Sequence, residues 1–186
     1  MSFLSSEQIS KYIEGDLFKN KLASLDLSIS NQYLEYDFKT IDIGNEETYS
    51  KSFKDFENLA LNPMETKLLK LSSKINLDIQ HTGFIFPRYS FTSLGINIAP
   101  IVIQPGYSGQ VLISVTNMHS DKIIKGILPG MKLVQIMLAP MISDTDSYSD
   151  LTSSKYVNDF SFSGSRAFSD EEITAIVSAS NSITNK

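Results

Sequence analysis

Hydrophobic and polar residues alternate along much of this chain, a pattern typical of β-strands that bury one face. Leu25, Leu27 and Ile29 are interleaved with polar residues. Further short apolar runs occupy residues 68–71, 84–86, 96–103, 111–115, 123–127 and 133–138. Proline and glycine residues separate these runs, as turns between strands require. Several short strands without long helices between them predict an antiparallel sandwich or barrel, and therefore a mainly β fold.

Two short helices are predicted near the chain ends from capping boxes, in which a serine and a Glu or Gln three residues later cap each other's backbone. Ser5 and Gln8 form one such pair, and we expect Gly15 to end the helix that follows. Ser169 and Glu172 form the other, ahead of an apolar face within residues 173–177. The β domain should therefore carry short flanking helices.

Two segments do not follow the strand pattern. In residues 46–61 the aromatic residues Tyr49, Phe53 and Phe56 have helical spacing, and a short helix or structured insertion and an irregular loop all remain open. From residue 143, Ser, Asp and Thr dominate, which indicates a surface loop or a connection to a tail. We therefore interpret residues 1–186 as a single domain whose residues 143–186 form a C-terminal loop or arm.

The composition allows one compact domain and argues against several classes of partner. The 186 residues are 41% hydrophobic, which is enough to build a core, and the net charge of -5 provides no broad cationic surface for nucleic acid or an anionic membrane. No apolar run reaches the roughly 18 residues of a membrane span, and the polar N-terminus does not have the pattern of a signal sequence. A cytoplasmic location is therefore expected.

The sequence also offers little for metal or thiol chemistry. It contains no cysteine, so it has no disulfide, no thiolate nucleophile and no thiolate metal ligand. His81 and His119 are its only histidines, and we expect them in structural or surface roles because a metal site needs more convergent ligands. We therefore predict no metal or cofactor held by protein ligands.

Three motifs in a fixed order give the sequence its most specific signal. Residues 87–95 are PRYSFTSLG, residues 103–110 are IQPGYSGQ ahead of an apolar strand that ends in Asn117, and residues 128–135 are LPGMKLVQ. Together they resemble the arginine motif, the β-hairpin motif and the Pro-Gly strand entry of the dUTPase and dCTP deaminase superfamily. The segment ASLDLS at residues 23–28 is similar to the opening of the dCTP deaminase branch.

This resemblance implies a distorted jelly-roll-like β-barrel of the trimeric dUTPase type, assembled as a homotrimer with pockets between subunits. It also implies a pyrimidine deoxynucleoside triphosphate as ligand, with Mg²⁺ entering only through the nucleotide phosphates. In the tail, Ser165 and Arg166 lie in a segment, SGSR, that resembles the glycine-rich arm that closes over a neighbouring subunit's site. An ordinary surface turn would explain this segment as well.

Four residues match binding positions of the superfamily, and each also has a structural explanation. Arg88 matches an arginine that binds phosphate, for which a planar guanidinium is suited, and the alternative is a salt bridge at the surface or at a trimer interface. Ser90 and Gln135 match hydrogen-bond donors to the phosphates, or they are polar residues of a turn and a strand. Tyr107 matches an aromatic position that lines the nucleoside pocket, or it packs on the core beside its turn.

The catalytic carboxylates of the superfamily are missing. Gln104 stands where dUTPases have an Asp that activates water, and an amide cannot accept a proton at neutral pH. Ser114 stands where dCTP deaminases have a Glu that shuttles protons. Tyr89 also replaces the first serine of the superfamily's arginine motif, and Ser93 replaces a further arginine that is typical of dCTP deaminases. We therefore predict no catalytic residue at the family positions, where Gln104 and Ser114 remain candidates for contacting the substrate.

Three hypotheses follow. The leading one is a dCTP deaminase-like and dUTPase-like protein that binds a pyrimidine deoxynucleotide, is catalytically impaired, and acts by binding, regulation or assembly. The first alternative is an active hydrolase or deaminase with relocated residues, although no spacing nominates Glu65, Asp78 or Asp37 as the new base. The second alternative is a trimeric structural or interaction protein that binds no nucleotide.

Overall fold

The computed structural model describes residues 3–15, 22–37, 50–143, 146–147 and 175, and most of these residues lie in β-strands. The strands are β1 Ile13–Glu14, β2 Leu25–Asp37, β3 Ser50–Asp55, β4 Leu59–Leu61, β5 Thr66–Asn76, β6 His81–Pro87, β7 Ile96–Ile98, β8 Ile101–Ile103, β9 Ser108–Asn117, β10 Ile124–Ile127 and β11 Lys132–Pro140. The helices are α1 Ser6–Ile9, the 3₁₀ helix η1 Ser10–Tyr12 and α2 Tyr89–Thr92. The prediction of a mainly β fold with short helices is confirmed.

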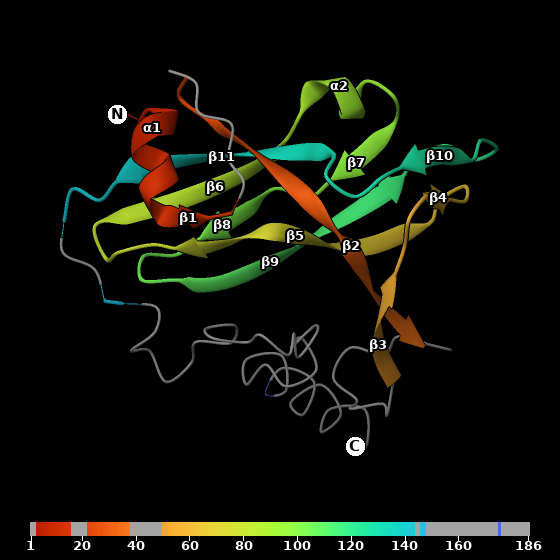
Figure 1. Cartoon of the computed structure of the whole chain (residues 1–186), viewed down its shortest axis with the longest axis horizontal. Coiled ribbons are helices and arrows are strands. Elements are labelled where there is room, and N and C mark those ends of the chain that lie inside the picture. Colours follow the sequence, from red (N-terminus) through yellow and green to blue (C-terminus); the bar gives the residue numbers. More distant parts are fainter. Residues whose placement is uncertain (1–2, 16–21, 38–49, 144–145, 148–174, 176–186) are drawn as a thin grey trace, which may run out of the picture.

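A nine-stranded sheet curls around the core in the order β7-β9-β5-β2-β11-β6-β8, with β1 added at β5 and β3 added at β2. Strands β10 and β4 form a separate pair. Figure 1 shows β2 crossing the molecule diagonally. Residues 25–28 of β2 pair with β11, whereas residues 29–34 pair with β5. Strand β2 therefore joins the two halves of the sheet and bends them into a partly closed barrel.

The core lies on the inner face of this curled sheet. Along β9, half-buried and buried residues alternate without interruption, so Val111, Ile113 and Val115 point into the core. From the other half of the sheet, Ile136 and Leu138 of β11 are fully buried. The hydrophobic and polar residues alternate with a period of two in the sequence because each strand has one apolar face and one polar face.

The N-terminal helix begins at its predicted capping box but ends earlier than predicted. The Gln8 N–H donates to the Ser5 hydroxyl, and the Ser5 N–H donates to the Gln8 side chain. After η1 the chain enters β1 at Ile13 instead of continuing as a helix to Gly15. Ile13 pairs with Ile75 of β5 and is buried there. Pairing with a strand that is distant in sequence therefore ends the helix.

Of the alternatives for residues 46–61, the short helix and the irregular loop were wrong where the structure describes them, and the structured insertion consists of strands. Residues 50–55 form β3 and residues 59–61 form β4. Strand β3 pairs with the second half of β2, where Phe53 lies opposite Leu34. The backbone of the long strand β2 needs hydrogen-bond partners along its whole length, and β3 provides them. The helical spacing of the aromatic residues was therefore coincidental.

The apolar run at residues 96–103 forms two strands and not one. Strand β7 pairs with β9, whereas β8 pairs with β6. Ala99 and Pro100 separate the two strands, and proline has no N–H to donate to a ladder. Because β7 and β8 stand at opposite ends of the sheet order, this break moves the chain from one end of the sheet to the other.

The predicted C-terminal helix and arm lie outside the described residues, apart from Ala175, which is helical. The assignment of residues 143–186 to a loop or arm therefore stays a prediction. In the part of the chain that the structure describes, no helix is long and apolar enough to cross a membrane.

Candidate functional site

The outer face of strands β2, β11 and β6 brings two predicted site residues together. Gln135 of β11 lies opposite Asp26 of β2 on one side and opposite Phe86 of β6 on the other. Opposite residues project from the same face, and so do residues two apart on a strand. Arg88 follows Phe86 by two residues and therefore lies on the same face as Gln135 and Asp26. We call Arg88, Gln135, Asp26 and Ser24 the polar patch.

Arg88 is anchored at the end of β6 but keeps part of its donor capacity. Its backbone N–H donates to Leu133 O at 3.0 Å, which extends the pairing with β11 by one residue. Its Nη1 donates to Lys132 O at 3.0 Å and lies 3.6 Å from Asp26 Oδ2. The Arg88 and Asp26 side chains are 37% and 34% exposed, so solvent screens this pair and it contributes less than about 1 kcal/mol. Among the described residues, none accepts a hydrogen bond from Nε or Nη2.

Gln135 is oriented by Ser24, the residue directly before β2. The Ser24 hydroxyl donates to Gln135 Oε1 at 3.0 Å, and the Gln135 side chain is half-buried. Because its carbonyl oxygen is engaged, its NH₂ group is available, and no acceptor for it lies among the described residues. The polar patch therefore offers N–H donors from Gln135 and Arg88 to an anion. The negative charge of Asp26 in the same patch repels an anion and so opposes this binding.

An apolar strip continues the same outer face along β6, away from Arg88. It consists of Phe84, Phe86, Val102 and Met137, with Phe84 opposite both Val102 and Met137 in the strand register. The rings of Phe84 and Phe86 stack with their centroids 6.3 Å apart. Phe86 is 40% exposed and Val102 is 56% exposed. Exposed apolar residues gathered beside polar ones are typical of a surface that contacts another molecule.

Gln104 lies at the other end of β6 from Arg88. Ile103 pairs with Gly83 near the start of β6, and Gln104 directly follows Ile103. Arg88 comes five residues after Gly83, which corresponds to about 16 Å along an extended strand. The arginine motif and the hairpin motif therefore occupy two separate regions of one chain.

Tyr107 is packed within the turn that precedes β9. It is 9% exposed, and its hydroxyl donates to Gln110 O at 2.9 Å. A Cβ atom on Gly109 would lie 2.9 Å from that hydroxyl, so a larger residue there would have to displace the ring. These contacts favour the structural explanation of Tyr107, and its place beside a nucleoside stays a prediction.

The remaining predicted residues do not join the polar patch directly. Ser114 is half-buried in β9, on the other half of the curled sheet. Ser90 is exposed in α2, two residues after Arg88. Ser165 and Arg166 lie outside the described residues. Of the binding residues proposed from sequence, the structure thus groups Arg88 and Gln135 and leaves Ser90 at their margin.

Two carboxylates considered as replacement bases are engaged by other groups. Glu65 accepts a backbone N–H hydrogen bond at 2.7 Å and lies 3.0 Å from Lys67 Nζ. Burial raises the pKa of the Glu65 carboxyl, but these contacts outweigh burial and hold the pKa below its ordinary value, which makes Glu65 a weaker base. Asp78 lies 2.7 Å from His81 Nδ1. Within the described ranges, no three His, Asp or Glu residues converge to hold a metal ion.

The chain matches the family model described as dCTP deaminase-like over residues 3–141. This chain belongs to the dCTP deaminase-like family. The dCTP deaminase of Ignicoccus hospitalis is 27% identical to this family member over 127 residues, which cover 64% of this chain and 71% of the relative. The dCTP deaminase of Caldivirga maquilingensis is 25% identical over 126 residues, which cover 64% and 69% of the two chains.

Solved structures show where this family member's fold occurs. The 2'-deoxycytidine 5'-triphosphate deaminase of Agrobacterium tumefaciens superposes with a TM-score of 0.56 at 17% identity, covering 73% of this chain and 47% of the other. The native EIAV dUTPase superposes with a TM-score of 0.50 at 17% identity, covering 77% of this chain and 98% of the other. The predicted dUTPase-type β-barrel is therefore confirmed.

Sequence reasoning assigned no site role to Asp26 or Ser24. A signal was present, because the alternation along β2 places Asp26 on the polar face, and both residues lie within residues 23–28, which carry a weak family match. What the sequence did not show was that β2 pairs with β11 and so places Asp26 directly opposite Gln135.

Proposed function

We propose that this dCTP deaminase-like protein binds a pyrimidine deoxynucleoside triphosphate at the polar patch and does not turn it over efficiently. The donor capacity of Arg88 carries the proposal, because Nε and Nη2 have no described partner and can make a bidentate contact to a phosphate. Mg²⁺ carried by the phosphates would offset the negative charge of Asp26.

A neighbouring copy of the chain supplies the rest of the pocket in this proposal. Arg88 lies about 16 Å along β6 from Gly83, the partner of Ile103, and Gln104 lies one residue further away, so a hairpin from another copy reaches Arg88 more readily than the chain's own hairpin. Packing that copy against the apolar strip would remove Phe86 and Val102 from water. Each chain then places its hairpin motif against the polar patch of one neighbour and receives the hairpin motif of a second neighbour at its own polar patch. This head-to-tail arrangement closes into a ring such as a homotrimer.

The proposal of weak or absent catalysis rests on the residues at the reacting positions. Gln104 has an amide, and among the described residues the Ser114 hydroxyl has no partner that could deprotonate it. Loss of a general base lowers rates by about 10² to 10⁴. Binding, regulation or assembly are the roles that remain for a pocket of this kind.

Calorimetric titration tests the proposed site. The native protein should bind dCTP or dUTP, and Arg88→Ala should weaken binding by about 10- to 100-fold, the effect of losing a charge-assisted hydrogen bond. Lys125→Ala is the matched control, because it removes an exposed positive charge from β10, outside the polar patch. Equal nucleotide affinity in Arg88→Ala and the native protein would remove Arg88 from the site.

Product analysis tests the chemistry separately. Chromatography after incubation of the native protein with dCTP or dUTP should show no deamination and no hydrolysis above a slow background. Steady turnover at about 1 s⁻¹ or faster would replace the proposal with the enzyme alternative.

Light scattering on a sizing column tests the assembly. The native protein should elute as a trimer, and Phe86→Lys should shift it toward the monomer by placing a charge in the apolar strip. Ile123→Lys is the control, because Ile123 is 51% exposed and lies outside the strip. A stable monomer of the native protein at micromolar concentration would contradict a site shared between copies.

A further inference from the structure

Helix α2 carries Ser90, two residues after Arg88, and has little packing of its own to hold it in place. It consists of four residues, none of which is buried, although Phe91 packs against the core. A single helical turn is not stable by itself in water, because it orders several residues for few hydrogen bonds. Figure 1 shows α2 standing outside the strands, between the end of β6 and β7. The position of Ser90 relative to Arg88 therefore depends on contacts at the two ends of this turn.

Overlapping hydrogen bonds join the turn of α2 into one unit. Arg88 O accepts from the Phe91 N–H at 3.0 Å, and Phe91 O accepts from the Leu94 N–H at 3.0 Å. The Ser93 hydroxyl donates to Ser90 O at 3.3 Å. Because these bonds follow one another along the chain, a displacement of Leu94 also displaces Ser90.

This unit is anchored at both ends. At its start, the Arg88 N–H is bonded to β11. At its end, Gly95 O accepts from the Met118 N–H at 2.9 Å, which continues the pairing of β7 with β9. One residue earlier, Leu94 O lies 3.0 Å from Nε2 of His119, in the loop that follows β9. A side chain of that loop therefore holds the end of α2 in addition to the backbone.

His119 is itself held in place. Its N–H donates to Asn117 Oδ1 at 3.0 Å, and its O accepts from the Met64 N–H at 3.2 Å. Its ring lies against Gly95, where a Cβ atom would be 2.5 Å from Nε2. A carbonyl oxygen only accepts hydrogen bonds, so Nε2 carries the proton in the contact with Leu94 O.

We propose that His119 is a positioning residue for the polar patch, which holds α2 by donating to Leu94 O and so keeps Ser90 beside Arg88. Both side chains then reach the phosphates of one nucleotide, and in this respect the inference rests on the proposed function. A hydroxyl that is already in place binds a phosphate without the loss of freedom that ordering a loose turn would cost. His119 thus contributes to nucleotide affinity without touching the nucleotide.

Two variants of His119 separate the donor from the ring. His119→Phe keeps a ring against Gly95 but lacks the N–H, so it should weaken calorimetric binding of dCTP or dUTP about fivefold, the effect of losing one neutral hydrogen bond. His119→Gln places an amide N–H near the former Nε2 and should restore the affinity to within about twofold of the native protein. Equal affinity in His119→Phe and the native protein, or an equal loss in both variants, would overturn the proposal.

A double-mutant cycle tests whether His119 acts through α2. Ser90→Ala removes the hydroxyl that α2 positions. His119→Phe should therefore cost little further nucleotide affinity when it is combined with Ser90→Ala, because the two changes remove the same contribution. The full fivefold loss in both backgrounds would contradict the positioning role and assign His119 to general support of the fold.

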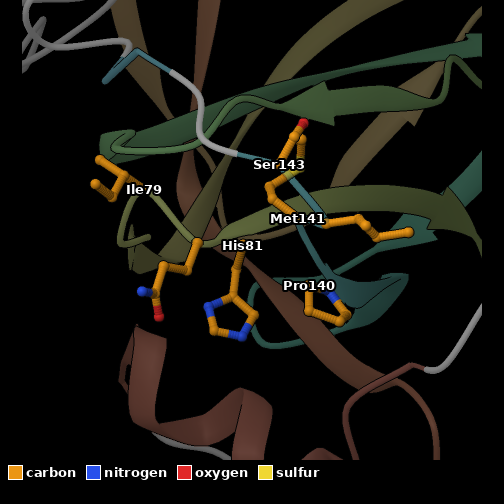
Figure 2. Close-up of a pocket in the computed structure, with 7 residues that line it drawn as sticks. Ile79, His81, Pro140, Met141 and Ser143 are labelled. Carbon is orange, nitrogen blue, oxygen red and sulfur yellow. The ribbon is translucent and has the colours of Figure 1, made fainter.

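Nitrogen NMR of the native protein tests the anchoring contact without a variant. Neutral His119 should be protonated at Nε2. His81 is the internal control, because it lines the hollow drawn in Figure 2, far from α2, and its Nδ1 lies 2.7 Å from the Asp78 carboxylate. Neutral His81 should accordingly be protonated at Nδ1. Protonation of neutral His119 at Nδ1 would overturn the anchor.

Amide hydrogen exchange of the protein without nucleotide separates this inference from the proposed function. His119→Phe should speed exchange of the Leu94 and Gly95 N–H groups about tenfold and leave the amides of β11 unchanged, whereas His119→Gln should keep the native rates. Unchanged exchange at Leu94 and Gly95 in His119→Phe would overturn the anchor, whether or not a nucleotide binds. Faster exchange there, in a native protein that binds no nucleotide, would remove the proposed function and leave the anchor of α2 supported.

Discussion

Asn117 holds together the end of β9, and its replacement by alanine should destabilise the fold strongly. Its side chain is fully buried. The two protons of its Nδ2 are shared among three carbonyls, Leu61 O at 3.1 Å, Asn62 O at 3.0 Å and Lys122 O at 2.7 Å, while its Oδ1 accepts from the His119 N–H at 3.0 Å. One amide thus joins the β4 end, the turn after it and the loop that follows β9.

The expected magnitude follows from these four contacts. Asn117→Ala leaves four backbone groups with one partner fewer, and each lost hydrogen bond costs about 1 kcal/mol, or more where the group stays away from water. Asn62 and Lys122 are exposed residues, so water can replace part of the hydrogen bonding that their carbonyls lose. We therefore expect a decrease of about 2–4 kcal/mol in the free energy of unfolding, or about 1–2 M in the urea midpoint.

Urea unfolding followed by far-UV circular dichroism measures this change. Asn97→Ala is the matched control, because Asn97 is exposed on β7, opposite Thr116 of β9, and its loss should change the free energy of unfolding by less than about 0.5 kcal/mol. All proteins must be compared at one concentration, since assembly would stabilise each of them. If Asn117→Ala and Asn97→Ala unfold at the same urea concentration, the reasoning from buried hydrogen bonds is refuted.

Three further predictions concern stability. A Cβ atom on Gly95 would lie 2.5 Å from His119 Nε2, at a φ of +78°, so Gly95→Ala should lower the free energy of unfolding by about 1–3 kcal/mol, and an unchanged melting temperature would speak against the clash. Leu133 is fully buried, so Leu133→Ala should cost about 2–5 kcal/mol in urea unfolding, whereas a cost below 1 kcal/mol would mean that the site collapses without a cavity. The pKa of Asp78 is lower in the folded chain than in the unfolded one, so its stabilisation is present above pH about 4 and is lost as the pH falls through the folded value. The gap in unfolding free energy between the native protein and Asp78→Asn should accordingly shrink on acidification, and a gap independent of pH would contradict the role of the ionised carboxylate.

The sequence by itself determined the features that depend on neighbouring residues. The alternation around Leu25, Leu27 and Ile29 located β2, because every second residue is apolar in a strand that buries one face. The pair Ser5 and Gln8 located the first helix, because a capping box closes within one helical turn. The three ordered motifs indicated the dUTPase-type barrel, which the family model and the solved structures confirm.

Only the tertiary structure decided which strands pair, because a strand's edge accepts partners from anywhere in the chain and local sequence does not specify them. Pairing with Ile75 drew Ile13 out of the predicted helix, and pairing with β2 turned residues 50–55 into β3. The same cause governs the candidate site. Asp26 stands beside Gln135 because β2 and β11 are adjacent, and Gln104 stands away from Arg88 because β8 runs antiparallel to β6.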